Sequence, residues 1–270
     1  MSEKPTRAAV VAGVDGSEAA VKAAQWAADE ALGRGVPLRL VYVTKPRHPS
    51  AEDYYADVHR GEAALQAAKA ELESTGSALM IQTATVDGPA GRALIEESRT
   101  AAMICVGSVG IGRYAQSILG STATELAEKS VCPTAIIRAD DYGTPADTQW
   151  IVFAMTDPQD DAVVESAMSE ARLRHAPVLA LGDLRASSVF DGQIEALKQT
   201  YPDVHLYPIT NEADVTHFLK KHDEAVQLAI VGSSDTAQIP RILGPFGRHR
   251  FHLFHHAASS VLVARRSATG

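Results

Sequence analysis

The chain has 270 residues, of which 46% are hydrophobic, and these values are typical of one large or two small globular domains. Its net charge of -8 at pH 7 argues against a DNA-binding surface, which needs a basic face, but is compatible with a small anion bound by backbone N–H groups. No apolar run approaches the roughly 18 to 20 residues that span a bilayer, and the run at 8–14 is too short for a signal sequence. We therefore expect a cytoplasmic protein with no nucleic-acid or membrane partner.

The first half of the sequence alternates short apolar runs with helical patterns. Runs rich in valine, isoleucine and leucine predict five buried strands, at 8–14, 37–43, 79–86, 101–106 and 134–138. Apolar residues at helical spacing, with capping residues before them, predict helices at 17–33, 61–76, 89–100 and 121–129. The segment 44–59 contains Pro46 and Pro49 and is predicted to be a loop. Strands that alternate with helices in this way form a parallel sheet covered on both faces.

The second half repeats this order of elements. It predicts strands at 149–155, 177–181, 204–208, 226–231 and 260–264, with helices at 161–175, 192–200 and 213–222 between them. The letters repeat as well, because Met103–Ser108 (MICVGS) matches Leu228–Ser233 (LAIVGS). The sequence therefore predicts an α/β chain of two tandem doubly wound domains, each a five-stranded parallel sheet with helices on both faces. The predicted bounds are 1–142 and 148–270, joined by the polar segment 139–148.

Glycines and polar residues follow the strands of the first half at the sheet edge where such folds bind ligands. The first strand runs into Gly13 and Asp15, and the second ends at Val43. The fourth strand continues into a glycine-rich stretch, Gly107–Arg113, and Gly120 then opens a helix. Glycines let a backbone approach an anion closely, and a helix N-terminus offers unpaired N–H groups. This pattern suits a polyphosphate.

Polar side chains in the same segments add to the predicted site. Ser121 and Thr122 supply hydroxyl donors, Arg113 supplies positive charge, and Asp15 can accept hydrogen bonds from sugar hydroxyls or a base amine. Each of these assignments has a purely structural alternative. Asp15 also suits a cap of the first helix, Thr122 with Glu125 forms a capping-box pattern, and Arg113 suits a solvated loop. Likewise, the two glycines at 107 and 110 are also compatible with ordinary turns.

The spacing Gly107-x2-Gly110-x9-Gly120-Ser121 resembles the G-x2-G-x9-G-(S/T) nucleotide motif of the ATP-binding universal stress proteins. The segment Asp15–Ser17 resembles the opening D-x-S of that family, and residues 127–138 are similar to its final helix and strand. The likeness covers residues 8–138 well and 150–265 weakly. It implies a fold like that of the adenine nucleotide alpha hydrolases, with ATP bound in the first domain, with or without Mg²⁺.

The resemblance also implies a role for each predicted site residue. Asp15 and the backbone at Gly13 and Val43 would hold adenine and ribose. The phosphates would be held by the motif residues and the helix start, which are Gly107, Gly110, Gly120, Ser121 and Thr122, and Ser108 and Arg113 would line the same loop.

The function that the resemblance implies is nucleotide-dependent regulation of a stress or energy response through an unidentified protein partner. The last strand of each domain would pair between the domains or in a homodimer. No base or nucleophile suited to rapid turnover stands in the motif, so we expect no enzyme activity beyond slow ATP hydrolysis. The sequence leaves open a slow ATPase or related nucleotide-processing enzyme, a cyclic-AMP binder and a scaffold that binds no nucleotide.

The second half keeps Gly232 at the position of Gly107 but departs from the motif at several other positions. Asp235 replaces the second glycine, Gly244-Pro245 replaces the helix-opening Gly120-Ser121, and Asp183 replaces Val43. The counterpart of Asp15 is Asp157 or, with a shift of one residue, Thr156. A carboxylate repels phosphate and proline has no N–H to donate, so we predict that this domain does not bind ATP.

Two further features are assigned structural roles. The histidine-rich segment 248–256 is predicted to be a basic helix face rather than a metal site, because no carboxylate or cysteine completes a ligand set nearby. Cys105 and Cys132 sit in or beside apolar runs and are predicted to be reduced, buried thiols.

Overall fold

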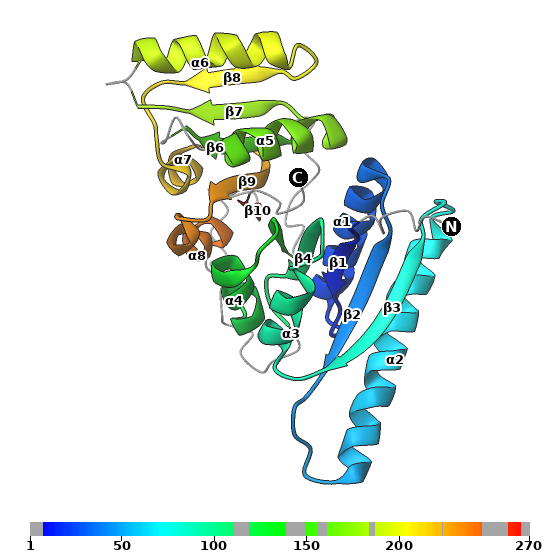
Figure 1. Cartoon of the computed structure of the whole chain (residues 1–270). Helices are drawn as coiled ribbons and strands as arrows, with labels where there is room; N and C mark the ends of the chain where they lie inside the picture. Colours follow the sequence, from blue (N-terminus) through cyan, green and yellow to red (C-terminus); the bar gives the residue numbers. More distant parts are fainter. Residues whose placement is uncertain are drawn as a thin grey trace, which may run out of the picture. The chain divides into compact units, whose positions relative to one another are not determined.

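The computed structural model describes residues 8–110, 119–138, 149–155, 161–183, 187–222, 224–244 and 259–265. The chain divides into two compact units (Figure 1). The first contains the described residues up to 138, and the second contains those from 149 to 265. Arg113, the linker at 139–148 and the histidine-rich segment 248–256 lie outside the described residues.

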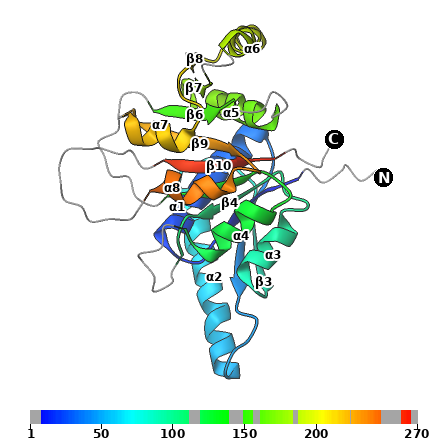
Figure 2. The ribbon, with the colours of Figure 1, turned by 90° about the vertical axis from the view of Figure 1, so that its left-hand side faces the viewer.

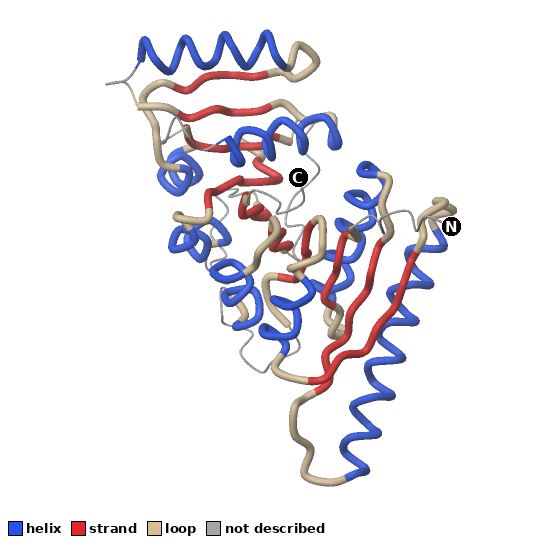
Figure 3. The backbone as a smooth tube through the Cα atoms, in the orientation of Figure 1, coloured by secondary structure: helices blue, strands red, loops and turns tan. Residues whose placement is uncertain are grey.

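The first unit is one parallel sheet with helices on both faces (Figure 3). Its strands lie in the order β3-β2-β1-β4-β5, with bounds Ile81–Asp87, Leu38–Thr44, Val10–Gly13, Met103–Gly107 and Thr134–Ile137. Its helices are α1 (Glu18–Arg34), α2 (Ala51–Ser74), α3 (Ala90–Glu97) and α4 (Ser121–Lys129). Tyr42 and Arg39 are three positions apart on β2, so their side chains point to opposite faces of the sheet. Tyr42 reaches Asp57 on α2 whereas Arg39 pairs with Glu97 on α3, and the two helices therefore cover opposite faces.

The second unit repeats this sheet. Its strands lie in the order β8-β7-β6-β9-β10, with bounds Leu206–Ile209, Val178–Leu181, Trp150–Ala154, Val226–Gly232 and Ser260–Ala264. Its helices are α5 (Asp161–Arg174), α6 (Ser187–Thr200), α7 (Val215–Lys221) and α8 (Ile239–Leu243), and a 3₁₀ turn at Thr236–Gln238 precedes α8. When β6 is matched to β1, the strand order of the two units is the same. The predicted fold class is confirmed.

Small residues bring the first helix close to the sheet. The face of α1 that lies against β1 and β4 is formed by buried alanines, among them Ala19, Ala23 and Ala27. A Cβ on Gly107 at the end of β4 would lie 2.7 Å from the Cβ of Ala19 and 2.8 Å from its backbone carbon. Gly107 is therefore required by the packing of the first turn of α1 on β4. Cys105 on β4 is buried, as is Cys132 before β5, and the two form no disulfide.

The prediction of a loop at 44–59 is wrong over its second half. Helix α2 begins at Ala51, directly after Pro46 and Pro49, and extends past the ends of β2 and β3 (Figures 1 and 2). Ser50 caps it, because its hydroxyl accepts a hydrogen bond from the Asp53 amide at 3.1 Å and donates one to Oδ2 of Asp53 at 2.7 Å. Both prolines precede Ser50, so they do not interrupt the helix that follows it.

Smaller differences occur at other helix ends. Pro89 is the N-cap of α3 rather than its first helical residue, and α6 begins at Ser187 rather than at residue 192. The short helix α8 and the 3₁₀ turn before it were not predicted. Helix α4 has the predicted bounds.

Candidate functional site

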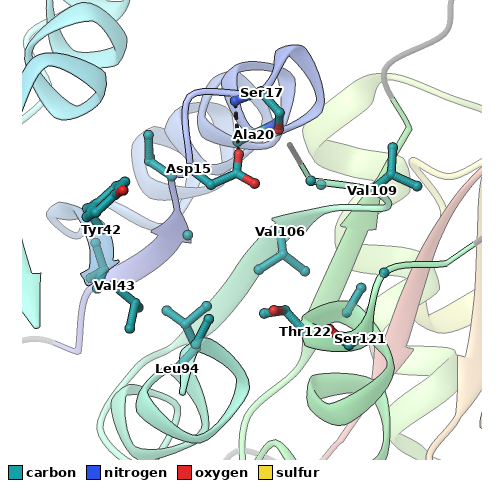
Figure 4. Close-up of a pocket in the computed structure, with 18 of the residues that line it drawn as sticks. Asp15, Ser17, Ala20, Tyr42, Val43, Leu94, Val106, Val109, Ser121 and Thr122 are labelled. Carbon is teal, nitrogen blue, oxygen red and sulfur yellow. Dashed lines mark hydrogen bonds between the residues drawn. The ribbon is translucent and has the colours of Figure 1, made fainter. Parts of the chain in front are cut away.

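A cavity of about 540 Å³ opens at the carboxyl ends of β1, β2 and β4 in the first unit (Figure 4). The first turns of α1, α3 and α4 complete its walls. It lies where the strand order reverses, because β1 stands between β2 and β4. Small-molecule sites usually have volumes of roughly 300 to 1,000 Å³, so the cavity is large enough for a nucleotide-sized ligand.

Eight of the ten predicted site residues line this cavity. They are Gly13, Asp15, Val43, Gly107, Gly110, Gly120, Ser121 and Thr122. Ser108 is fully buried and is not among the lining residues, and its hydroxyl has no hydrogen-bond partner within the described part of the chain. Arg113 lies outside the described residues. The cavity thus brings together residues that are more than 100 positions apart in sequence. The contacts of these residues with a ligand stay predictions.

Asp15 stands at the turn between β1 and α1. Its Oδ1 accepts a hydrogen bond from the Ser17 amide at 2.9 Å, and Ser17 itself is the N-cap, accepting from the Ala20 amide at 3.2 Å. The capping role considered for Asp15 therefore belongs to Ser17. Oδ2 of Asp15 would lie 2.4 Å from a Cβ placed on Gly110. A side chain at Gly110 would therefore displace the Asp15 carboxylate from this position.

Gly120 has a different reason to be glycine from that of Gly107 and Gly110. Its φ of -72° is open to any residue, and a Cβ there would meet the Ser108 carbonyl oxygen at an ordinary 3.5 Å. Its amide donates to that carbonyl at 2.7 Å, which fixes the loop against the start of α4. The geometry leaves room for a Cβ at this position, so packing of the fold does not explain the glycine.

The N-terminus of α4 opens into the cavity. Gly120 is its N-cap and brings no side chain to cap the first turn, whose residues Ser121, Thr122 and Ala123 line the cavity. Because the first N–H groups of a helix have no intrahelical partner, they are available to an anion. The capping-box alternative for Thr122 is wrong, since Thr122 lies inside the helix.

Glu125 lies between α4 and α3 and does not cap its own helix, α4. A Cβ on Gly91, in the first turn of α3, would lie 2.4 Å from its Oε2. A carboxylate at a helix N-terminus is favoured by the helix dipole, so the Glu125 side chain on α4 suits its place against the start of α3. The two helix starts that it joins both line the cavity, through Ala90 on α3 and Ser121 on α4.

The apolar wall of the cavity was missed by sequence reasoning. It includes Val41, Leu94 and Val106. Figure 4 shows Val106 between Asp15 and Thr122, and Leu94 beside Val43. Val41 and Val106 belong to predicted strands and Leu94 to a predicted helix, but the face that each presents is fixed only by the packing of α3 on the sheet. The position of Val106, one residue before the first motif glycine, was the available signal.

The corresponding edge of the second unit is built differently. The backbone carbonyl of Asp235 accepts from the Gln238 amide at 2.9 Å, so the chain after β9 turns directly into the 3₁₀ helix. Gly244, with a φ of 71°, ends α8, whereas Gly120 begins a helix. The sequence match between Gly244 and Gly120 therefore has no structural counterpart, and Pro245 lies outside the described residues.

Strand register helps to align the two units at Asp15. The Met155 amide donates to the Leu181 carbonyl as the Val14 amide donates to Val41. Residue 156, the next along the chain, then corresponds to Asp15. Thr156 and Asp157 themselves lie outside the described residues.

Comparisons with known proteins agree with these features. Residues 7–138 match the model of the universal stress protein family. The chain is 49% identical over 270 residues to the universal stress protein Rv2624c of Mycobacterium tuberculosis, covering 97% of this chain and 98% of that relative. The chain belongs to the universal stress protein family. Another universal stress protein of that species, Rv3134c, is 40% identical over 181 residues, which cover 67% of each chain.

A solved structure of a universal stress protein supports the fold of the whole chain. The protein, from Archaeoglobus fulgidus, aligns over 97% of this chain and 100% of its own, with a TM-score of 0.71 and 14% identity. The family resemblance predicted from the glycine spacing is confirmed, and the part that matches the family model contains the cavity and all ten predicted residues. In this universal stress protein, no helix among the described residues could cross a membrane, and the same residues contain no group of His, Cys, Asp and Glu fit to hold a metal.

Proposed function

We propose that this universal stress protein binds ATP in the cavity of its first unit, and that binding regulates its association with a protein partner in the cytoplasm. The observation that carries the proposal is the start of α4, which opens without a side-chain cap into the same cavity as Asp15. An anion-binding helix end and a carboxylate in one cavity match the two ends of a nucleotide.

The phosphate end would lie at Gly120–Thr122. Backbone N–H groups and the two hydroxyls of Ser121 and Thr122 supply donors, and the helix dipole favours negative charge at this end. The missing Cβ of Gly120 leaves room beside the loop at 108–110. Asp15 is the one carboxylate among the described lining residues, so Mg²⁺ would be held mainly by the phosphates themselves.

The base end would lie against the apolar wall of the cavity. Val41, Val43 and Leu94 offer an apolar surface to the faces of a purine, and Asp15 can accept hydrogen bonds from the ribose. The described lining contains no histidine, lysine or cysteine, so we propose that turnover of bound ATP is slow.

Calorimetry on the full-length protein tests the proposal. We expect one ATP per chain, bound by the first unit, and we expect Gly120→Asp to abolish binding because its carboxylate would face the phosphates. Gly192→Asp in α6 is the matched control, since a Cβ at Gly192 meets nothing within 4 Å. Two equivalent ATP molecules per chain, or full ATP affinity in the Gly120→Asp variant, would contradict the proposal.

The alternatives have distinct signatures in the same preparation. Displacement of ATP by cyclic AMP at equal concentration would favour a cyclic-nucleotide binder. Steady hydrolysis of several ATP molecules per minute would favour an enzyme. Failure of the wild-type protein to bind any adenine nucleotide would leave the scaffold function.

A further inference from the structure

A buried carboxylate in α2 gathers four donors behind the cavity. Oδ1 of Asp57 accepts from the Tyr42 hydroxyl at 2.9 Å and from Arg60 at 3.2 Å. Oδ2 accepts from the Lys45 amide and from Nε2 of His48, each at 2.9 Å. Burial would raise the pKa of Asp57, but these hydrogen bonds outweigh burial and hold that pKa well below its ordinary value.

This network holds the end of β2 at two positions, one before and one after Val43. Tyr42 and Val43 line the cavity, and the Asp57 carboxylate binds the chain at Tyr42 and again at Lys45. The Tyr42 ring also packs on Gly61 of α2, where a Cβ would lie 2.4 Å from a ring carbon. The backbone of Val43 is thus held from the α2 side, between two anchored neighbours.

The network continues from β2 toward α3. The Thr44 hydroxyl donates to the Asp87 carboxylate, and the Thr44 carbonyl accepts from the Gly88 amide at 3.1 Å. Gly88 leads directly into α3, whose Leu94 forms the opposite part of the apolar wall. Thr44 stands between Tyr42 and Lys45, the two positions bound by Asp57, so the end of β2 connects the Asp57 contacts to the segment that leads into α3.

The second unit builds the same sheet with different residues at this place. The first residues of the matching strands are separated by 43 in residue number in the first unit (Leu38 to Ile81) and by 28 in the second (Val178 to Leu206). Gly182, which has no hydroxyl, follows β7 at the position of Tyr42. In the described part of the second unit, a five-stranded sheet of this order thus forms without a tyrosine hydroxyl at this position. The strand order therefore does not depend on the Tyr42–Asp57 contact.

We propose that Asp57 is a positioning residue for nucleotide binding, holding the end of β2 so that Val43 and the apolar wall are set at the spacing of an adenine ring. The inference rests on the proposed function of the cavity. It separates two parts of the site: Asp57 controls the base end, and the start of α4 controls the phosphate end independently.

The test compares ATP with inorganic tripolyphosphate, which has the phosphates but no base. Affinities are measured for the full-length wild type and for Asp57→Asn by displacement of a fluorescent ATP analogue. We expect Asp57→Asn to weaken ATP about tenfold, because an amide cannot accept from all four donors, and to leave tripolyphosphate nearly unchanged. Tyr42→Phe keeps the ring on Gly61 but removes one donor, and should weaken ATP about threefold.

A matched variant and a folding check complete the experiment. Asp203→Asn removes a carboxylate that accepts two hydrogen bonds from Arg172 in the second unit, and should leave both affinities unchanged. If Asp57→Asn does not fold, as judged by circular dichroism, Tyr42→Phe carries the test. Equal weakening of ATP and tripolyphosphate, or no weakening of ATP, would overturn the inference while leaving the proposed function standing. A wild type that binds neither ligand would instead remove the proposed function and the inference with it.

Discussion

The two units have the same strand order but differ beyond the strand ends. In both, the middle strands are buried apolar segments, such as Met103–Val106 in β4 and Leu228–Val231 in β9. At the carboxyl edge, the first unit has a glycine-lined loop and a helix start, whereas the second turns directly into a 3₁₀ helix at Asp235. Buried apolar pairs therefore specify the sheet, while a few residues after each strand specify the site, and the second set can change without the first.

The packing of the second helix on its strand differs in a reciprocal way. In the first unit, the Tyr42 ring on β2 fills the space left by Gly61 on α2. In the second, the Phe190 ring on α6 fills the space left by Gly182 after β7. The same volume is thus occupied from the strand in one unit and from the helix in the other.

The largest loss of stability that we expect comes from adding a tyrosine ring at Gly182 of the second unit, where the Phe190 ring already fills the space. Gly182→Tyr would place a second aromatic ring against Phe190, whose ring carbons lie 2.5 Å from the position of a Cβ. Overpacking of this kind should lower the free energy of unfolding by about 3 kcal/mol. The double variant with Phe190→Gly copies the first unit and should recover much of that loss. Urea unfolding of the wild type, the two single variants and the double variant measures the coupling, and an additive double variant would argue that the two positions are independent.

The next effect distinguishes two glycines of one motif. Gly107→Ala should lower the free energy of unfolding by about 1 to 3 kcal/mol, because its Cβ would collide with Ala19. Gly120→Ala should change it by less than about 0.5 kcal/mol, since a weaker N-cap is offset by a less flexible unfolded chain. Thermal and urea unfolding measure both. Equal destabilisation by the two variants would mean that Gly120 is also required by the fold.

The smallest effect is the dependence of stability on pH. The pKa of Asp57 is lower in the folded protein than in the unfolded chain, so its contribution to stability is present above the ordinary carboxyl pKa of about 3.9 and is lost as the pH falls through the folded-state pKa. Asp57→Asn should therefore be less stable than the wild type at pH 7, with a gap that narrows below about pH 4.

The matched control for this pH series is again in the second unit. Asp203 is exposed and its pKa is lowered by the hydrogen bonds from Arg172, so Asp203→Asn should open a much smaller gap at pH 7. Urea unfolding between pH 3 and pH 7 measures both gaps. A gap for Asp57→Asn that stays constant over this range would show that the carboxylate charge does not stabilise the fold.

Much of the fold could be predicted because its signals are local. The buried run at β4 and the bounds of α4 follow from residues next to one another in sequence. The start of α2 was predicted ten residues late, because Pro46 and Pro49 were given more weight than the cap formed by Ser50. Prolines exclude a helix only where they stand, and this helix begins after them.

Most residues of the candidate site were predicted from the sequence, but the packing around each of them was not. The glycine spacing identified Gly107, Gly110 and Gly120, yet their separate roles depend on Ala19, Asp15 and Ser108, which approach from distant parts of the chain. The Asp57 network and the apolar wall had no sequence signal of comparable strength. Both arise from the packing of α2 and α3 on opposite faces of β2.

The reciprocal placement of ring and glycine bears on how a duplicated chain assembles. Two similar halves in one polypeptide risk exchanging helices during folding. If α6 docked on β2, Phe190 and Tyr42 would compete for one space, and if α2 docked on β7, Gly61 and Gly182 would leave that space empty. Each helix therefore fits its own strand better than the other, and we expect mispaired intermediates to be less stable than the native pairing.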